Sequence, residues 1–151
     1  MPPDAASPAR RPLLDRALGL LLLTPAVTVL AFALRLPPSP TGVGTHRQLG
    51  LGGCTLLQLT GLPCPMCGMT TTFALAVRGR LLDALLCQPF GLALFLLTVA
   101  AAVVSALELI APRGRLRRAW DWLGFKEGWV AGALLAGLLA GWCWKLIAMR
   151  S

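Results

Sequence analysis

The amino-acid sequence predicts an all-α membrane protein with three transmembrane helices, and with a short re-entrant or interfacial helical hairpin between the first and second. Hydrophobic residues make up 56% of the 151 residues and charged residues only 13%, about half the charged share of a soluble domain. A chain this short and apolar cannot bury its hydrophobic residues in a water-soluble core. Three long apolar runs can each cross a bilayer, whereas a fourth uncharged stretch, residues 48–77, is broken by glycine and proline.

The first transmembrane helix is expected at residues 17–35. Eighteen uncharged residues lie between Arg16 and Arg35. At about 1.5 Å each they span about 27 Å, close to the thickness of the hydrocarbon core. We expect the preceding residues 1–16 to form a disordered basic leader. Ala31-Phe32-Ala33 has the form of a signal-peptide cleavage site, so the sequence leaves open whether this helix is retained or cleaved.

The hairpin is expected over residues 48–79, after a proline-rich loop at 36–47. Glycines and prolines divide this stretch into two short helical pieces, at about 54–60 and 70–77, and the sequence Cys64-Pro65-Met66-Cys67-Gly68 lies between them. Irregular backbone at membrane depth must be surrounded by protein or water. We therefore predict a hairpin that enters or lies on the membrane, with two cysteines at its turn.

Two further transmembrane helices are expected at residues 89–110 and 128–148, so that residues 17–150 form a single helical membrane domain. The intervening segment, 112–127, carries five basic residues and two tryptophans, which is typical of a membrane-surface loop or a short amphipathic helix. The last helix has small residues at four-residue spacing, which permit close packing within this chain or against a second copy. These are Gly128, Gly132, Gly137 and Gly141.

Charge predicts the orientation of the chain. Three passes place residues 1–16 and 112–127 on one side, with eight Lys and Arg residues against six on the other side, whereas a fourth crossing would make the counts equal. The positive-inside rule then predicts a cytoplasmic N-terminus and a cysteine hairpin toward the outer face, where disulfides persist. Orientation in the lipid bilayer accounts for the net charge of +8, so we expect no nucleic-acid partner.

The cysteine turn permits a metal site. Cys-Pro-x-Cys-Gly is the form of a zinc knuckle, in which one turn points two thiolates at the same ion. Cys54 and His46 are the nearby residues that could complete a tetrahedral Cys3His set with Cys64 and Cys67, although the gaps between them lie outside the usual paired spacing. Zinc is the metal that this set would hold.

Two other interpretations of the turn remain open. It can be a structural or assembly clip, whose thiols only pack or pair. Alternatively, Cys64 and Cys67 form a redox pair, because the start of a helix lowers the pKa of a thiol. A helical membrane oxidoreductase would normally need a second cysteine pair, and Cys54 supplies only half of one. The sequence shows no paired carboxylates, phosphate loop or catalytic triad. A non-enzymatic role is therefore our working interpretation, and the thiol redox protein is the alternative that keeps the question of an enzyme open.

The residues around the turn also resemble a known family. The resemblance covers about residues 45–100 and rests on His46, Cys54, the run Thr60-Gly61-Leu62-Pro63-Cys64-Pro65-x-Cys67-Gly68-Met69-Thr70-Thr71, Arg78-Gly79 and Gln88-Pro89. These look like a bacterial integral-membrane family known only as a domain of unknown function, with the signature C-P-x-C-G-x-T. Many members carry arginine where this chain has Thr71. The resemblance implies a helical protein of the bacterial inner membrane and no defined activity. We expect any protein partner of this chain to be another membrane protein or a second copy of the chain itself.

Overall fold

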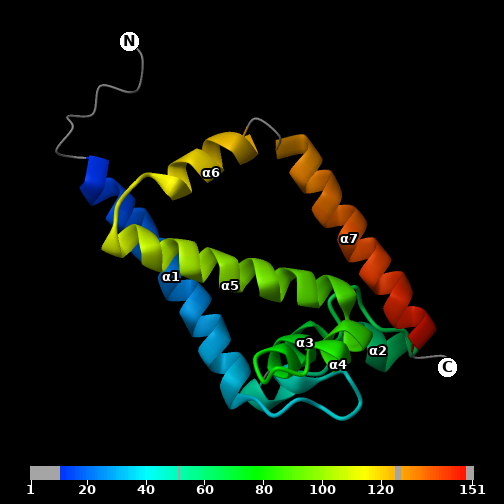
Figure 1. Ribbon diagram of the computed structural model, residues 1–151. Coiled ribbons are helices and arrows are strands. Elements are labelled where there is room, and N and C mark those ends of the chain that lie inside the picture. The colour runs from blue at the N-terminus through cyan, green and yellow to red at the C-terminus, as the bar shows by residue number, and fades with distance from the viewer. Residues whose placement is uncertain (1–10, 51, 125–126, 149–151) are drawn as a thin grey trace. The chain divides into compact units, whose positions relative to one another are not determined.

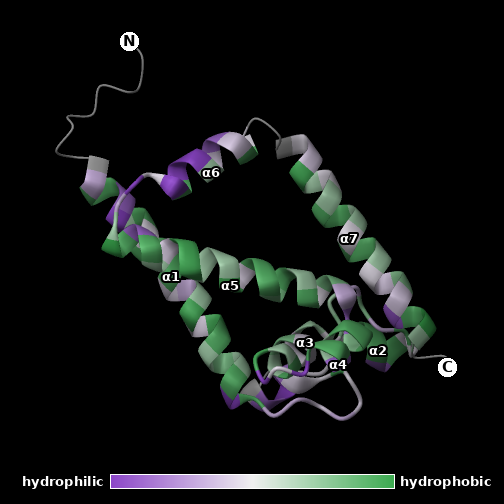
Figure 2. Cartoon of the chain, viewed as in Figure 1, coloured by the Kyte–Doolittle hydropathy of each residue, from purple (hydrophilic) through white to green (hydrophobic). Residues whose placement is uncertain are grey.

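The computed structural model describes residues 11–50, 52–124 and 127–148, and every regular element in those ranges is helical (Figure 1). Three helices are long and apolar enough to cross a membrane: α1 (Arg11–Arg35), α5 (Pro89–Ile110) and α7 (Glu127–Ala148). Hydrophobic residues follow one another along most of each (Figure 2). At most 17% of the residues in these spans are buried, so most of their apolar side chains face outward, as they do in lipid. The predicted fold class is confirmed.

Short helical elements connect α1 to α5. They are η1 (Thr45–Leu49), α2 (Thr55–Thr60), α3 (Met69–Ala76) and α4 (Leu81–Cys87). At about 1.5 Å per residue, α3 is only about 12 Å long, less than half of the hydrocarbon core. The cysteine turn lies between α2 and α3, as expected. Two elements were not expected: η1 begins inside the predicted loop at 36–47, and α4 follows the predicted hairpin.

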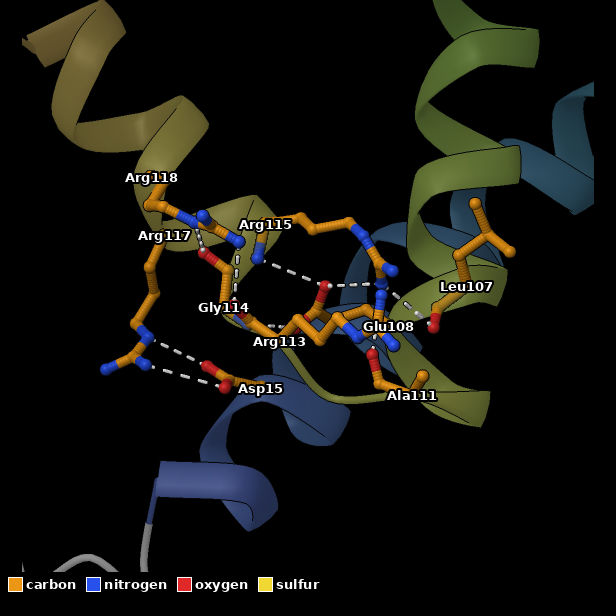
Figure 3. Close-up of polar contacts among 9 residues, drawn as sticks. All are labelled: Asp15, Leu107, Glu108, Ala111, Arg113, Gly114, Arg115, Arg117 and Arg118. Carbon is orange, nitrogen blue, oxygen red and sulfur yellow. Dashed lines mark hydrogen bonds and ion pairs between the residues drawn. The ribbon is translucent and has the colours of Figure 1, made fainter.

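The chain divides into two compact units, and the three long helices contribute residues to both. The first unit contains residues 1–28 and 98–130, which include the amphipathic helix α6 (Arg115–Gly124). In this unit the fully buried carboxylate of Glu108 accepts hydrogen bonds from the backbone N–H groups of Gly114 (2.5 Å) and Arg115 (3.1 Å) (Figure 3). The end of α5 thereby caps the start of α6 with a negative charge.

Helix α1 begins before its apolar run does. The predicted disordered leader, residues 1–16, is wrong for residues 11–16, which form the first turns of α1, and residues 1–10 lie outside the described ranges. The physical reason is a long-range ion pair: the buried carboxylate of Asp15 lies 2.7 Å from Nε of Arg117 on α6 (Figure 3). A charge that would otherwise interrupt a membrane helix is neutralised inside the protein.

The second unit contains residues 29–97 and 131–151, and it holds the cysteine turn. Arg78, which follows α3, ties this helix to the end of α1. Its guanidinium donates to the carbonyl oxygens of Ala33 (3.0 Å) and Leu34 (2.7 Å), which lie in the last turn of α1 and have no partners within that helix.

Helix α3 lies in the core of the second unit. Ala74 is completely buried, and the ring of Phe73 meets that of Phe95 on α5 edge to face at 5.5 Å. On another side of the helix, the buried hydroxyls of Thr71 and Thr45 hydrogen-bond at 2.8 Å, which joins α3 to η1. The helix that follows the cysteine turn is therefore fixed by both apolar and polar contacts.

Candidate metal centre

The cysteine turn is folded by its own backbone. The N–H of Cys67 donates to the carbonyl of Cys64 over 2.9 Å, which closes a tight turn. Gly68 follows with a φ of 93°, a left-handed conformation that residues with a side chain rarely adopt, and it leads the chain into α3. The two thiols project from one turn, and their sulfur atoms lie 3.4 Å apart.

Side chains from distant parts of the sequence hold this turn by its carbonyl oxygens. Trp142 Nε1, on α7, donates to the carbonyl of Pro63 over 2.7 Å. The buried side chain of Gln88, immediately before α5, donates from Nε2 to the carbonyl of Pro65 over 3.2 Å. These donors hold the backbone on both sides of Cys64.

Cys54 brings a third sulfur to the turn. It is the N-cap residue of α2, and its Sγ lies with those of Cys64 and Cys67 so that all three are within 4.8 Å of one another. All three are free thiols. Two sulfurs bound to one zinc ion at about 2.3 Å in a tetrahedron are about 3.8 Å apart. To bind an ion, the Cys64–Cys67 pair would therefore open by about 0.4 Å, and the distances from Cys54 would close by about 1 Å at most.

Two cavities border the cluster. The larger, of about 550 Å³, has mainly apolar walls from α1 and α3. Its lining includes the three cysteines of the cluster and His46. The smaller, of about 100 Å³, is lined by Arg47, Gln58 and again by His46, Cys54 and Cys67. His46 thus borders both cavities, but it does not belong to the 4.8 Å cluster. Of the four predicted ligands, the structure gathers three and leaves the histidine beside them.

The thiols differ in acidity because their surroundings differ. The backbone N–H of Leu57, in the first turn of α2, favours the thiolate of Cys54 and lowers its pKa to about 7. Burial disfavours the thiolate of Cys67 and raises its pKa to about 12, and the neighbouring sulfur of Cys64 adds to this effect. The sequence argument that a helix start lowers the pKa of the cysteine pair is therefore wrong for Cys67, whereas it describes Cys54.

A buried lysine lies on the other side of the turn. Lys145 of α7 is 5% exposed, and its Nζ donates to the carbonyls of Gly42 (3.1 Å) and Cys87 (3.3 Å). The same nitrogen lies 3.2 Å from the position that a Cβ on Gly68 would occupy, and Gly68 directly follows Cys67. Among the described residues, no carboxylate forms an ion pair with Lys145. Its charge is therefore available to balance a negative centre at the turn.

The four glycines predicted to support helix packing fall into two groups. A Cβ on Gly137 or Gly141 would come within 2.7 and 2.9 Å, respectively, of the side chain of Phe90, so these glycines let α7 approach α5 closely. A Cβ on Gly128 or Gly132 would meet no described atom within 4 Å. Among the described residues, Gly137 and Gly141 thus lie at a helix contact, and Gly128 and Gly132 have no such neighbour.

Comparison with known families supplies one match. Residues 54–102 match Protein of unknown function (DUF2752). The match confirms the resemblance to a family of unknown function, and it brings no activity with it. The DUF2752 region begins at Cys54 and includes the whole sulfur cluster and Gln88, but it leaves out His46 and Lys145. Neither the curated proteins nor the solved structures contain a match to this chain.

The part that three residues play in shaping the site was not recognised from the sequence, although Gln88 belongs to the pattern of the family resemblance. Gln88 lies within the DUF2752 region. From the sequence alone it marks only the start of a helix, because it precedes a proline. From the sequence alone, Trp142 is interpreted as an interfacial tryptophan, since it lies near the end of an apolar run. Lys145 carries the clearest signal: a lysine inside a membrane helix is unfavourable unless its ammonium group finds polar partners.

Proposed function

We propose that this chain is a multi-pass membrane protein in which Cys54, Cys64 and Cys67 hold one zinc ion in a structural knuckle. The observation that supports the proposal is the approach of the three sulfur atoms to within 4.8 Å, from two segments of the chain: the residue that caps the start of α2, and the turn between α2 and α3. The ion would join the start of α2 to the turn before α3. Zinc supplies this kind of cross-link in small domains that lack a large core.

The donor set favours zinc over a hard cation. Neither cavity beside the sulfurs is lined by Asp or Glu, and magnesium and calcium prefer oxygen ligands. Three thiolates around Zn²⁺ carry a net charge of −1. Lys145 beside the turn and Arg47 in the smaller cavity offset this charge.

We assign the fourth coordination position to His46. This residue lines both cavities together with Cys54 and Cys67, so its ring has space on the side of the sulfurs. Binding requires the imidazole to move toward the cluster. Substitution of His46 by alanine should weaken zinc binding without removing it, because the three thiolates remain.

The test is the metal content of the purified protein. In detergent, the wild-type chain should contain about one zinc ion per chain. Cys54→Ser, Cys64→Ser and Cys67→Ser should each lose it. Cys143→Ser is the matched control, since Cys143 is exposed on α7 and lies outside the cluster. Zinc-free wild-type protein, even after incubation with zinc, would refute the proposal, as would a Cys54→Ser variant that binds zinc as tightly as the wild type.

A membrane thiol–disulfide protein is the second candidate, and the 3.4 Å distance between the sulfurs of Cys64 and Cys67 supports it. Two thiols would form a Cys64–Cys67 bond and pass two electrons and two protons to a disulfide of a partner protein, which becomes two thiols. In glutathione redox buffers, the metal-free chain should then lose two thiols reversibly. The loss should disappear in Cys64→Ser and persist in Cys143→Ser. A constant thiol count at every ratio of the buffer would rule the candidate out.

We place the protein in the bacterial inner membrane, with a cytoplasmic N-terminus and the cysteine hairpin toward the outer face. The excess of Lys and Arg in residues 1–16 and 112–127 supports this orientation. A metal knuckle on the outer face would also keep its thiols from oxidation by holding them as metal-bound thiolates. The glycines of the first half of α7, Gly128 and Gly132, remain available for a second membrane protein or a second copy.

A further inference from the structure

Helix α6 exposes the face that a helix in water would bury. Its apolar residues recur at the spacing i, i+3, i+4 and i+7, which makes one stripe of Leu116, Ala119, Trp120 and Leu123. Trp120 is 75% exposed and Leu123 is 38% exposed. The stripe is therefore open to the medium around the protein, which is lipid or water.

Two arginines outside this stripe, Arg115 and Arg117, attach α6 to the rest of the protein. Arg117 forms an ion pair with the buried Asp15 of α1, and Arg115 lies 3.6 Å from the buried carboxylate of Glu108 (Figure 3). A helix that pairs two of its arginines with buried carboxylates and leaves its apolar stripe exposed is suited to an apolar medium beside that stripe.

The connections of α6 keep it at the membrane face. Only residues 111–114 separate it from the end of the span α5, and only residues 125–126 separate it from α7. Four residues reach at most about 14 Å, and α6 itself is about 15 Å long. Because both of its ends are tethered to spans, α6 lies along the bilayer surface.

Two arginines near the start of α6 are free to meet lipid headgroups. Arg113 and Arg118 are both exposed, and neither forms an ion pair with a described carboxylate. Within the described part of the chain, the guanidinium of Arg118 donates to backbone carbonyls, those of Arg113 (3.0 Å) and Gly114 (3.4 Å). Figure 2 shows this hydrophilic segment at the start of the helix, before its apolar residues. A guanidinium pair beside an inserted apolar stripe matches the phosphate of an anionic lipid.

We propose that α6 is an interfacial helix that selects anionic phospholipids: Trp120 and Leu123 enter the acyl boundary, while Arg113 and Arg118 bind the headgroup phosphate. The proposal does not depend on zinc in the cysteine cluster.

The test uses the full-length chain in vesicles of phosphatidylcholine mixed with phosphatidylglycerol. Lipids brominated on the upper acyl chain quench tryptophans that reach the boundary, and the difference between wild type and Trp120→Phe isolates the contribution of Trp120. Competition between brominated phosphatidylglycerol and brominated phosphatidylcholine gives the preference for the anionic lipid. The double variant Arg113→Gln/Arg118→Gln should lose about fivefold of that preference for each arginine.

Arg35→Gln/Arg80→Gln is the matched control, because it removes two exposed arginines from the other compact unit and should keep the wild-type preference. Added salt should lower the preference of the wild type as well, without any substitution. Equal preference in the Arg113→Gln/Arg118→Gln variant and the wild type would overturn headgroup binding. If Trp120 is not quenched at all, its stripe is covered by protein, such as a second copy, and the proposal is wrong.

Discussion

At Cys54, the backbone N–H of Leu57 makes the largest contribution to the lowered pKa of the thiol. The pKa of about 7 means that the thiolate dominates above neutral pH, whereas Cys67, with a pKa of about 12, keeps its proton until strongly alkaline conditions. Alkylation requires the thiolate. In metal-free protein, the alkylation rate of Cys54 should rise through a midpoint near pH 7, and Cys67 should stay unmodified up to about pH 11. Mass spectrometry of the modified peptides measures both.

The exposed Cys143 provides the accessibility reference for that experiment. Zinc should protect Cys54 at every pH, because the bound thiolate is no longer available to the reagent. A midpoint for Cys54 near that of an ordinary thiol, about 8.5, would show that the amide of Leu57 does not stabilise it.

Gly68 is constrained by its neighbours as well as by its backbone angle. A Cβ there would lie 3.0 Å from the carbonyl oxygen of Gly42 and 3.2 Å from Nζ of Lys145, whereas Gly79, with a similar positive φ of 77°, has open space around it. Gly79→Ala should lower the free energy of unfolding by about 1–2 kcal/mol, through backbone strain alone. Gly68→Ala should lower it by about 1–3 kcal/mol more, because it also crowds the lysine.

Unfolding by sodium dodecyl sulfate in detergent, with a chelator present, separates these effects from metal binding. Equal losses in the two variants would mean that the space around Gly68 is larger than the structure shows.

Among the elements, helix α7 donates hydrogen bonds from two tryptophans to the backbone around the cysteine turn and to α4. Trp142 donates to the Pro63 carbonyl beside Cys64, and Trp144 donates to the Leu86 carbonyl of α4 over 2.9 Å. Each substitution by phenylalanine removes one hydrogen bond of the same kind. Trp142→Phe should weaken zinc binding by about 10–100-fold, as loss of an outer-shell partner does. Trp144→Phe should leave the zinc affinity unchanged, which competition with a chromophoric chelator can measure.

A similar loss of affinity in both tryptophan variants would mean that α7 acts on the site only through general stability. Equal affinity in the wild type and Trp142→Phe would mean that the turn holds its shape without the bond from α7. The pair therefore distinguishes positioning of the ligands from packing.

The elements that could be predicted are those that form through interactions between residues close together in the sequence. Helix α5 follows from its apolar run, because a bilayer allows an uncharged segment of this length few conformations other than a helix. The first turns of α1 could not be predicted, since Asp15 there is neutralised by Arg117, which lies 102 residues away in the sequence. The turn that Cys54 meets is likewise held by distant donors, Trp142 and Gln88. Local spacing suggested Cys54 as a ligand but could not show that it reaches the pair.

At the scale of the whole molecule, the number of crossings decides which surfaces share a side of the membrane. In the described part of the uncharged stretch at 48–77 there are two α-helices, and the longer, α3, covers about 12 Å, which is too short for a fourth span. With three spans, we predict that the two ends of the chain lie on opposite faces, with α6 on the face of the N-terminus. In sealed vesicles, a protease should remove an epitope tag at only one end, and a tag inserted after Gly124 should behave like the N-terminal tag. Equal removal of both terminal tags would require an even number of crossings, and α6 would then face the side assigned to the cysteine hairpin.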